Sequence, residues 1–397
     1  MKTLLFYCQH TPDMGHLIRC IAIARGLMQD FQVYFVNGGQ AIHEFPIPQG
    51  IKLINLPVVR SGVDIFAFQG MAPALEGSAT LERRRDLLLE LCDRIHPDAV
   101  MLEQFPFGHH QFFTELIPLL KWTKEHGVKT ICSVRDIVVA RQDHTRYEMD
   151  VCQLINRYFD QLLIHGDPSF IAFNQSFSRV KDLTCEIHYT GYVVPDIDRE
   201  FAPRTKADPP MILVSMGSGH FGYELLDCIA ETSQYLEDKI PHDIRVFAGP
   251  FAPEDVYSRL REAAACCSNL SVERYTPDLL SHMAKADLFI SMASYATTLN
   301  TLQTGVRSIQ LPFMGHHDQA QRLRSERLGE LGLVKLVEVA DLGPILFSFE
   351  IIEMLNREPS HIYFCLRGIQ ITAARVRALV TGEDKFAPLT QVLTVYS

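Results

Sequence analysis

His16 lies at the start of a predicted helix, directly after an apolar run that predicts a strand over residues 3–8. Ligands of open parallel sheets bind outside the carboxyl ends of the strands, so chemistry is expected at this position. The positive end of the helix dipole favours a neutral imidazole, which is the form that a general base requires. Gly15 lets a ligand or a neighbouring backbone approach closely. A histidine that only caps or packs is the alternative interpretation.

A glycine-rich turn, residues 216–222, follows a second predicted strand and precedes another helix. Such a turn exposes backbone N–H groups and directs a helix dipole at a phosphate. The turn is not GxGxxG and lacks the lysine of a P-loop. A phosphate cradle and a plain tight turn therefore both remain open.

Hydroxyl groups gather on a helix predicted after the strand over residues 288–291. Ser294 suits an N-cap and Gly305 suits the position after the last turn. A single helical face collects four hydroxyl side chains, Ser294, Thr297, Thr298 and Thr301. We expect this face to bind a diphosphate and a sugar, with a solvent-facing polar surface as the alternative.

Short polar groups follow the next predicted strand, over residues 308–311. Asp318, Gln319 and Gln321 can bond sugar or ribose hydroxyls. The pairs His109–His110 and His316–His317 are the tempting metal ligands, but adjacent histidines on a loop do not easily converge on one ion. Neither HxH nor HExxH spacing is present, so we predict no metal.

Composition, net charge and cysteine spacing disfavour several classes of protein. The chain has 397 residues, of which 47% are hydrophobic, and a net charge of −10. This balance predicts a folded chain and disfavours a nucleic-acid or anionic-membrane binder. The arginine run 83–85 is predicted to be a solvated helix face. Ten cysteines without a CxxC pair, no signal peptide and no long apolar run predict a cytoplasmic protein without integral membrane association.

Short apolar strands alternate with helical segments twice along the chain. The first series of predicted strands covers 3–8, 32–36, 52–56, 99–102, 129–134 and 161–164; the second covers 211–215, 244–247, 270–273, 288–291, 308–311 and 333–337. This alternation predicts an α/β fold of two Rossmann-like domains with parallel sheets. We place the domains at 1–194 and 209–375 around a proline-rich linker, and expect 376–397 to pack back onto the first.

With these residues in place, the chain resembles the GT-B glycosyltransferases. It is most similar to bacterial predicted glycosyltransferases related to the lipid-II-forming N-acetylglucosaminyltransferase. The resemblance covers nearly the whole chain and rests on the order and spacing of segments 14–27, 103–108, 134–137, 283–305 and 321–328. The first reads MGHLIRC followed by AIARGL, and the last matches Q-x-x-R-x-E-R-L.

The resemblance implies a nucleotide-sugar site in a cleft between the two halves, with the donor held by the second half and the acceptor by the first. It implies no cofactor and no metal, because helix N-termini and amides stabilise the leaving diphosphate. His16 would be the base for a hydroxyl acceptor, oriented by a carboxylate. Asp136 and Glu103 both end strands, and Asp136 is slightly preferred.

The candidate substrate-binding residues are Gly15, Met216, Gly217, Ser218, Gly219, Tyr275, Ala293, Ser294, Thr297, Thr298, Asn300, Asp318, Gln319 and Gln321. Asn300 stands where the family commonly has a ribose-binding glutamate, and Ala293-Ser294 replaces a pair of small glycines. We therefore expect altered donor binding. The donor is expected to be a UDP-sugar and the acceptor a small molecule or a lipid. Apolar side chains within residues 63–78 suggest a lipid or aromatic acceptor, with a mobile loop as the alternative interpretation.

Two other functions fit the same motifs. A nucleotide-sugar hydrolase similar to the UDP-sugar hydrolase of the pseudaminic acid pathway would use His16 to assist water. A non-catalytic nucleotide-sugar-binding protein would explain Asn300 and Ala293. The sequence gives no indication of the oligomeric state.

Overall fold

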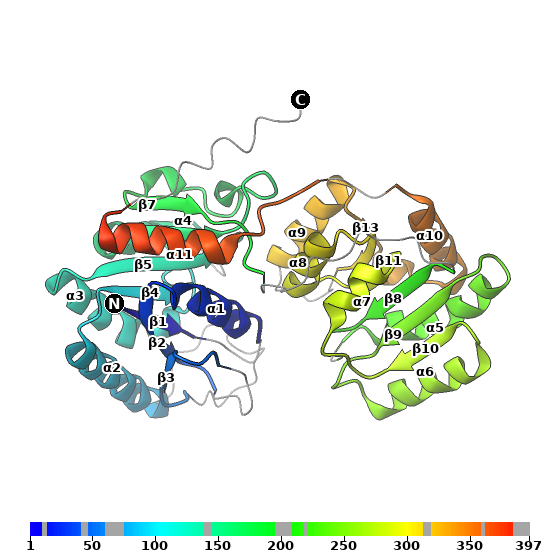
Figure 1. The fold of residues 1–397 in the computed structure, drawn as a ribbon, viewed down its shortest axis with the longest axis horizontal. Helices are drawn as coiled ribbons and strands as arrows, with labels where there is room; N and C mark the ends of the chain where they lie inside the picture. Colours follow the sequence, from blue (N-terminus) through cyan, green and yellow to red (C-terminus); the bar gives the residue numbers. More distant parts are fainter. Residues whose placement is uncertain are drawn as a thin grey trace. The chain divides into compact units, whose positions relative to one another are not determined.

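The computed structural model describes residues 1–9, 14–40, 47–59, 75–138, 144–194, 209–217, 219, 221–312, 319–358 and 362–383. The chain divides into two compact units (Figure 1). One unit comprises Met1–Pro195 together with Cys365–Ser397, and the other comprises Asp196–Phe364. The second half predicted from the sequence ends at residue 375, whereas the chain returns to the first unit at Cys365. The linker predicted over 195–210 lies outside the described residues as far as position 208.

The first unit is built on a parallel sheet of seven strands in the order β3-β2-β1-β4-β5-β6-β7. The strands are β1 (Lys2–Cys8), β2 (Phe31–Asn37), β3 (Lys52–Asn55), β4 (Ala99–Glu103), β5 (Lys129–Arg135), β6 (Gln161–His165) and β7 (Glu186–Tyr189). The sequence predicted the first six of these. It missed β7, a four-residue edge strand that is not fully buried and therefore lacks a continuous apolar run.

Helices cover both faces of this sheet. They are α1 (Met14–Leu27), α2 (Leu75–Ile95), α3 (Phe113–Glu125), α4 (His144–Tyr158) and α11 (Gly368–Thr381), with short 3-10 turns η1 (His110–Phe112), η2 (Phe173–Gln175) and η3 (Val180–Asp182). Side chains of β1 alternate between two cores, since Leu5 faces α2, α3 and α4 while Leu4 faces α1 and α11. A Cβ at Gly26 would lie 2.4 Å from Ile369 Cγ2, so α1 needs a glycine where α11 packs on it.

The second unit is built on a parallel sheet of six strands in the order β10-β9-β8-β11-β12-β13. The strands are β8 (Met211–Ser215), β9 (Asp243–Phe247), β10 (Leu270–Glu273), β11 (Leu288–Met292), β12 (Ser308–Leu311) and β13 (Val334–Leu336). The helices are α5 (Tyr223–Glu237), α6 (Glu254–Cys266), α7 (Leu279–Lys285), α8 (Tyr295–Thr304), α9 (Gln319–Glu330) and α10 (Pro344–Asn356), with a 3-10 turn η4 (Val339–Asp341). All six strands were predicted.

Both sheets reverse their strand order beside the first strand, between β1 and β4 in one unit and between β8 and β11 in the other. At such a point the connections leave in opposite directions, which opens a ligand-binding crevice at the carboxyl ends of the two strands. His16 follows β1 and Glu103 ends β4. None of the helices in the described part of the chain combines the length and apolar character that a transmembrane span requires.

Arg84 on α2 is completely buried, which shows that the expected solvated face is wrong at this position. Its guanidinium donates to both carboxylate oxygens of buried Glu115 on α3, at 2.6 and 2.8 Å, and to the Gly38 carbonyl at 2.8 Å. Tyr7 completes the network, with its hydroxyl 2.5 Å from Glu115 and 3.0 Å from Arg84. The neighbouring Arg83 is exposed, as predicted. One buried ion pair thus joins two helices to the end of β1.

We expect Arg84→Met to lower the free energy of unfolding by about 3–5 kcal/mol, because it leaves the Glu115 charge buried and unpaired. Arg83→Met is the matched control on the same helix turn and should change stability by less than about 0.5 kcal/mol. Urea unfolding followed by circular dichroism measures both. Equal unfolding midpoints for the two variants would contradict the burial of Arg84.

His165, at the end of β6, is also fully buried. Its Nε2 lies 2.7 Å from the Ser133 hydroxyl and its Nδ1 2.8 Å from the Thr190 hydroxyl. Burial, reinforced by the positive charge of Arg19, lowers the pKa of His165 to about 3. The imidazole is therefore neutral in the folded protein and both of its nitrogens are held by hydroxyl groups.

This lowered pKa predicts a stability that depends on pH. The unfolded chain binds a proton at His165 near pH 6.5 and the folded chain does not, so the stabilisation is present above about 6.5 and is lost as the pH falls. From pH 7.5 to 5 the loss from this group is about 2 kcal/mol. His165→Gln should flatten the dependence by that amount, measured by urea unfolding at each pH, and a slope equal to that of the wild type would contradict the prediction.

Candidate active site

The two residues at the strand reversal of the first unit contact each other directly. His16 Nδ1 lies 2.6 Å from Oε1 of Glu103. β1 and β4 are neighbours in the sheet, so the first turn of α1 and the end of β4 lie at the same edge. The sequence predicted both as site residues, and the structure joins them in one hydrogen bond.

Glu103 is completely buried and accepts from three side chains. Besides His16, Oε1 accepts from Arg19 Nη2 at 2.5 Å, and Oε2 lies 3.2 Å from His109 Nε2. Burial alone would raise the pKa of Glu103, but His16, His109 and Arg19 outweigh it and hold that pKa well below its usual range. The carboxylate is therefore ionised in the folded protein.

His16 keeps part of its ring at the surface, since its side chain is 19% exposed. Burial lowers the pKa of His16; the Glu103 carboxylate opposes this effect, while Arg135 and Arg19 add to it. A neutral imidazole that donates Nδ1–H to a carboxylate carries its lone pair on Nε2. The geometry therefore orients the His16 ring so that the lone pair on Nε2 points away from Glu103.

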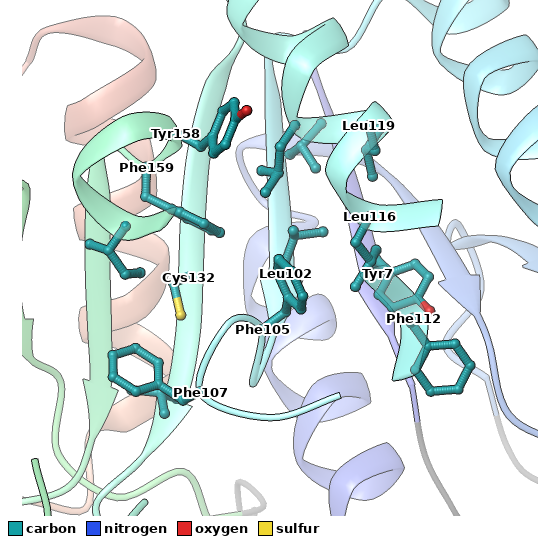
Figure 2. Close-up of a cluster of buried hydrophobic side chains, with 14 of the residues drawn as sticks. Tyr7, Leu102, Phe105, Phe107, Phe112, Leu116, Leu119, Cys132, Tyr158 and Phe159 are labelled. Atoms are coloured by element: carbon teal, nitrogen blue, oxygen red, sulfur yellow. The ribbon is translucent and has the colours of Figure 1, made fainter. Parts of the chain in front are cut away.

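The segment from Gln104 to His109 is held in an unusual backbone shape. Gln104 and His109 both have positive φ, 63° and 61°, which non-glycine residues rarely adopt. Between them, Phe105 and Phe107 are buried in the core cluster of Figure 2, where Phe105 lies by Leu102 of β4. These two buried aromatic side chains hold the segment in place, and the His109 side chain lies against the Glu103 carboxylate.

His16 contacts Glu103, whereas Asp136, the carboxylate slightly preferred from the sequence, makes other contacts. Its two carboxylate oxygens accept from the Ile137 amide at 3.0 Å and the Tyr192 hydroxyl at 3.1 Å. Gly166 packs against the same side chain, where a Cβ on this glycine would lie only 2.6 Å from the Asp136 Cβ. Asp136 follows β5, and β4 separates β5 from β1, which explains the difference.

Arg19 and His109, which also contact Glu103, were given no role from the sequence. Arg19 belongs to the MGHLIRC segment, and that pattern was the signal that could have identified it. His109 was considered only as a metal ligand together with His110, which instead bonds the Pro106 carbonyl at 2.8 Å. Ligand atoms of His16, Glu103 and His109 lie within 4.8 Å of one another, a spacing that suits a metal ion. Arg19 already supplies a positive charge at this carboxylate.

The glycine-rich turn of the second unit follows β8. Gly217, Gly219 and Gly222 all have positive φ, and a Cβ at Gly222 would lie 2.4 Å from Met216 Cε. The Met216 amide donates to the Phe247 carbonyl at 3.1 Å, so it is occupied by sheet structure. The candidate Ser218 lies outside the described residues.

α8 begins beside this turn, because β11 is the neighbour of β8. Ser294 and Thr297 form a capping box, with Thr297 N donating to Ser294 Oγ at 3.1 Å and Ser294 N donating to Thr297 Oγ1 at 2.8 Å. Thr298 is buried, so the hydroxyl face is not solvent-facing. The Ala293 amide donates to the Leu311 carbonyl at 2.7 Å, and therefore belongs to the backbone that positions the helix.

The remaining candidates lie around α8. Asn300 is half-buried one turn further along the helix, and Tyr275 is 61% exposed after the edge strand β10. Gln321 lies in the first turn of α9, where buried Arg324 stacks 4.8 Å over the Tyr295 ring of α8. Gln319 begins α9, and Asp318 lies outside the described residues.

The known proteins that are similar to this chain are glycosyltransferases. The family described as "Glucosyltransferase 3-like, N-terminal domain" matches residues 71–169. A UDP-N-acetylglucosamine--N-acetylmuramyl-(pentapeptide) pyrophosphoryl-undecaprenol N-acetylglucosamine transferase of Mannheimia succiniciproducens is 25% identical over 173 residues, covering 43% of this chain and 47% of that protein. The transferase of the same name from Vibrio cholerae is 33% identical over 102 residues, 26% of this chain and 28% of that one. The matched part thus spans less than half of these relatives.

Solved structures match along almost the whole chain. MurG of Acinetobacter baumannii superposes with a TM-score of 0.61 at 16% identity, covering 96% of this chain and 100% of that one. UGT2 of Phytolacca americana, in complex with UDP-2-fluoro-glucose and pterostilbene, gives 0.61 at 13% identity with the same coverage. The resemblance predicted from the motifs is confirmed: the chain has the GT-B glycosyltransferase fold and is related in sequence to the bacterial N-acetylglucosamine transferases.

Proposed function

We propose that this protein is a glycosyltransferase that moves a sugar from a nucleotide-diphosphate donor to a hydroxyl acceptor. The observation that carries the proposal is the His16–Glu103 hydrogen bond at the strand reversal of the first unit, with the outer nitrogen of His16 left to act as a base. The sequence relationship to N-acetylglucosamine transferases supports the reaction class. UDP is the favoured nucleotide, because the names of the related transferase and of the UGT2 complex specify UDP-sugars.

In the proposed reaction, Nε2 of His16 accepts the proton of the acceptor hydroxyl while its oxygen attacks the anomeric carbon of the sugar. The bond between that carbon and the diphosphate oxygen breaks, and its electron pair leaves with the diphosphate. The ionised Glu103 stabilises the imidazolium that forms, as a buried carboxylate does for a catalytic histidine. Arg19 donates to the same carboxylate oxygen as His16, and its positive charge keeps Glu103 ionised.

The donor is assigned to the second unit. The turn follows β8 and α8 follows β11, and these two strands are neighbours in the sheet. A helix N-terminus stabilises the negative charge of a leaving diphosphate. Asn300 and Gln321 are proposed to bond the hydroxyl groups of the donor. The charge of the leaving group is met by helix dipoles in this proposal, so no metal is required.

His16→Ala should lower kcat/KM by about 10²–10⁴-fold, the usual contribution of a general base. The measurement is UDP release from UDP-glucose and UDP-N-acetylglucosamine with a panel of hydroxyl acceptors. Because the pKa of His16 is lowered, the neutral base persists in mild acid and the wild-type acid limb should lie below pH 6.5. An unchanged rate in the variant would exclude this role.

Three controls accompany this experiment. His126→Ala removes an exposed histidine stacked on Trp122 and should leave the rate unchanged. EDTA should have no effect on the wild-type rate, and a loss of activity would show that a metal is needed. UDP release that is equally fast without an acceptor would favour the hydrolase instead.

Asn300→Glu should tighten UDP-sugar binding by about fivefold, since a hydrogen bond to a charged group contributes about 1 kcal/mol more than one to a neutral group. Isothermal titration with UDP-glucose and UDP-N-acetylglucosamine measures the effect. Asn300→Gln has the length of glutamate without its charge and separates the two contributions. Weaker binding by Asn300→Glu than by the wild type would show that Asn300 does not face the ribose.

A further inference from the structure

We propose that His109 is a positioning residue that fixes the plane of the Glu103 carboxylate and thereby the angle at which Glu103 holds His16. The inference rests on the proposed function, in which His16 is the base. It assigns a role to a third side chain that touches neither the reacting hydroxyl nor the donor in that mechanism.

The two oxygens of Glu103 are held from different elements. Oε1 meets two donors from α1, His16 at 2.6 Å and Arg19 at 2.5 Å. A carboxylate held at one oxygen can still turn about its terminal bond, so a partner on the second oxygen is needed to fix its plane. His109 Nε2 provides that partner at 3.2 Å from the segment after β4. The angle of the His16 hydrogen bond therefore depends on His109.

The backbone at His109 supports a specific role for its side chain. His109 adopts φ 61° and ψ 29°, the left-handed region, which is energetically unfavourable for a non-glycine residue. Glycine would adopt this shape without that cost, yet the chain carries an imidazole there. The Phe112 amide donates to the His109 carbonyl at 2.9 Å and closes the turn that holds the ring.

The ring of His109 is placed between the base and the core. Its centroid lies 6.2 Å from that of His16 and 6.2 Å from that of Phe112, with edge-to-face angles of 66° and 64°. Its side chain is only 13% exposed. Packing on both sides thus limits the rotation of the imidazole and directs Nε2 at Glu103.

The deciding variant is His109→Gly, because glycine accepts the positive φ and removes only the side chain. Relief of the backbone strain should offset part of the lost hydrogen bond, so we expect a melting temperature close to that of the wild type, a kcat about tenfold lower and an unchanged KM. Imidazole added to the buffer should restore part of the rate, and His109→Gln, which keeps a donor, should restore more. Wild-type kcat in the glycine variant would overturn the proposal, as would a loss that imidazole and glutamine both fail to restore.

A second readout needs no enzyme activity. A hydrogen bond of 2.6 Å deshields its proton, so the Nδ1 proton of His16 should give a low-field proton NMR signal that is absent in His16→Ala. In His109→Gly this signal should shift or broaden, whereas in His126→Gly it should not. An identical signal in His109→Gly and the wild type would overturn the positioning role. If the wild type transfers no sugar from any donor, the proposed function fails and this signal still decides the role of His109.

Zn²⁺ titration separates the positioning role from a metal site. His16, Glu103 and His109 have the spacing of a metal site, while Arg19 on the same carboxylate opposes a dication. We expect micromolar Zn²⁺ to leave the low-field signal in place. Stoichiometric loss of the signal on addition of Zn²⁺, reversed by EDTA, would identify a metal site and overturn the proposal.

Discussion

A single buried negative charge organises the candidate site. The Glu103 carboxylate is completely removed from water, and an ionised carboxylate in such a place is tolerated only when partners compensate it. Arg19 supplies the compensating charge, and two imidazoles supply further hydrogen bonds. Everything proposed for the chemistry follows from this arrangement, because the same contacts that stabilise the buried charge also orient His16.

The surrounding fold restricts each partner of that charge. His16 and Arg19 are three residues apart on α1, so one helical face presents both. His109 arrives on a segment whose aromatic residues are buried beneath it, as Figure 2 shows for Phe105 and Phe107. A second buried pair, Arg84 with Glu115, ties α2 and α3 to Tyr7 of β1. The end of β1 is thus held on both faces of the sheet.

In the second unit, backbone hydrogen bonds position the candidate site residues, whereas in the first unit a buried charge does so. The amides of Met216 and Ala293, which the sequence suggested for phosphate, bond to neighbouring strands. The hydroxyls of Ser294 and Thr297 cap α8. Their contribution is therefore to place the turn and the helix start, while the donor contacts proposed here fall to Asn300, Gln321 and the dipole of α8.

Local sequence patterns were sufficient to predict most strands of the two sheets and where each of them ends. Buried parallel strands such as β1 and β8 contain short continuous apolar runs, and that local pattern needs no tertiary information. Among the strands that the structure describes, the edge strand β7 was missed, because its partial burial leaves no such run. The positions of His16 and Glu103 after their strands were equally readable, and so were the glycine-rich turn and the cap at Ser294.

The tertiary structure decided which of these residues meet. Glu103 and Asp136 both end strands, and the sequence cannot order the strands; β4 pairs with β1 while β5 does not, so Glu103 reaches His16. Arg84 and Arg83 are adjacent in sequence, yet only the packing of α2 against α3 buries one of them. His109 contacts Glu103 from a position with left-handed backbone conformation, which local sequence patterns did not predict. Pairing between distant segments is set by packing of the whole unit, and local sequence patterns do not encode it.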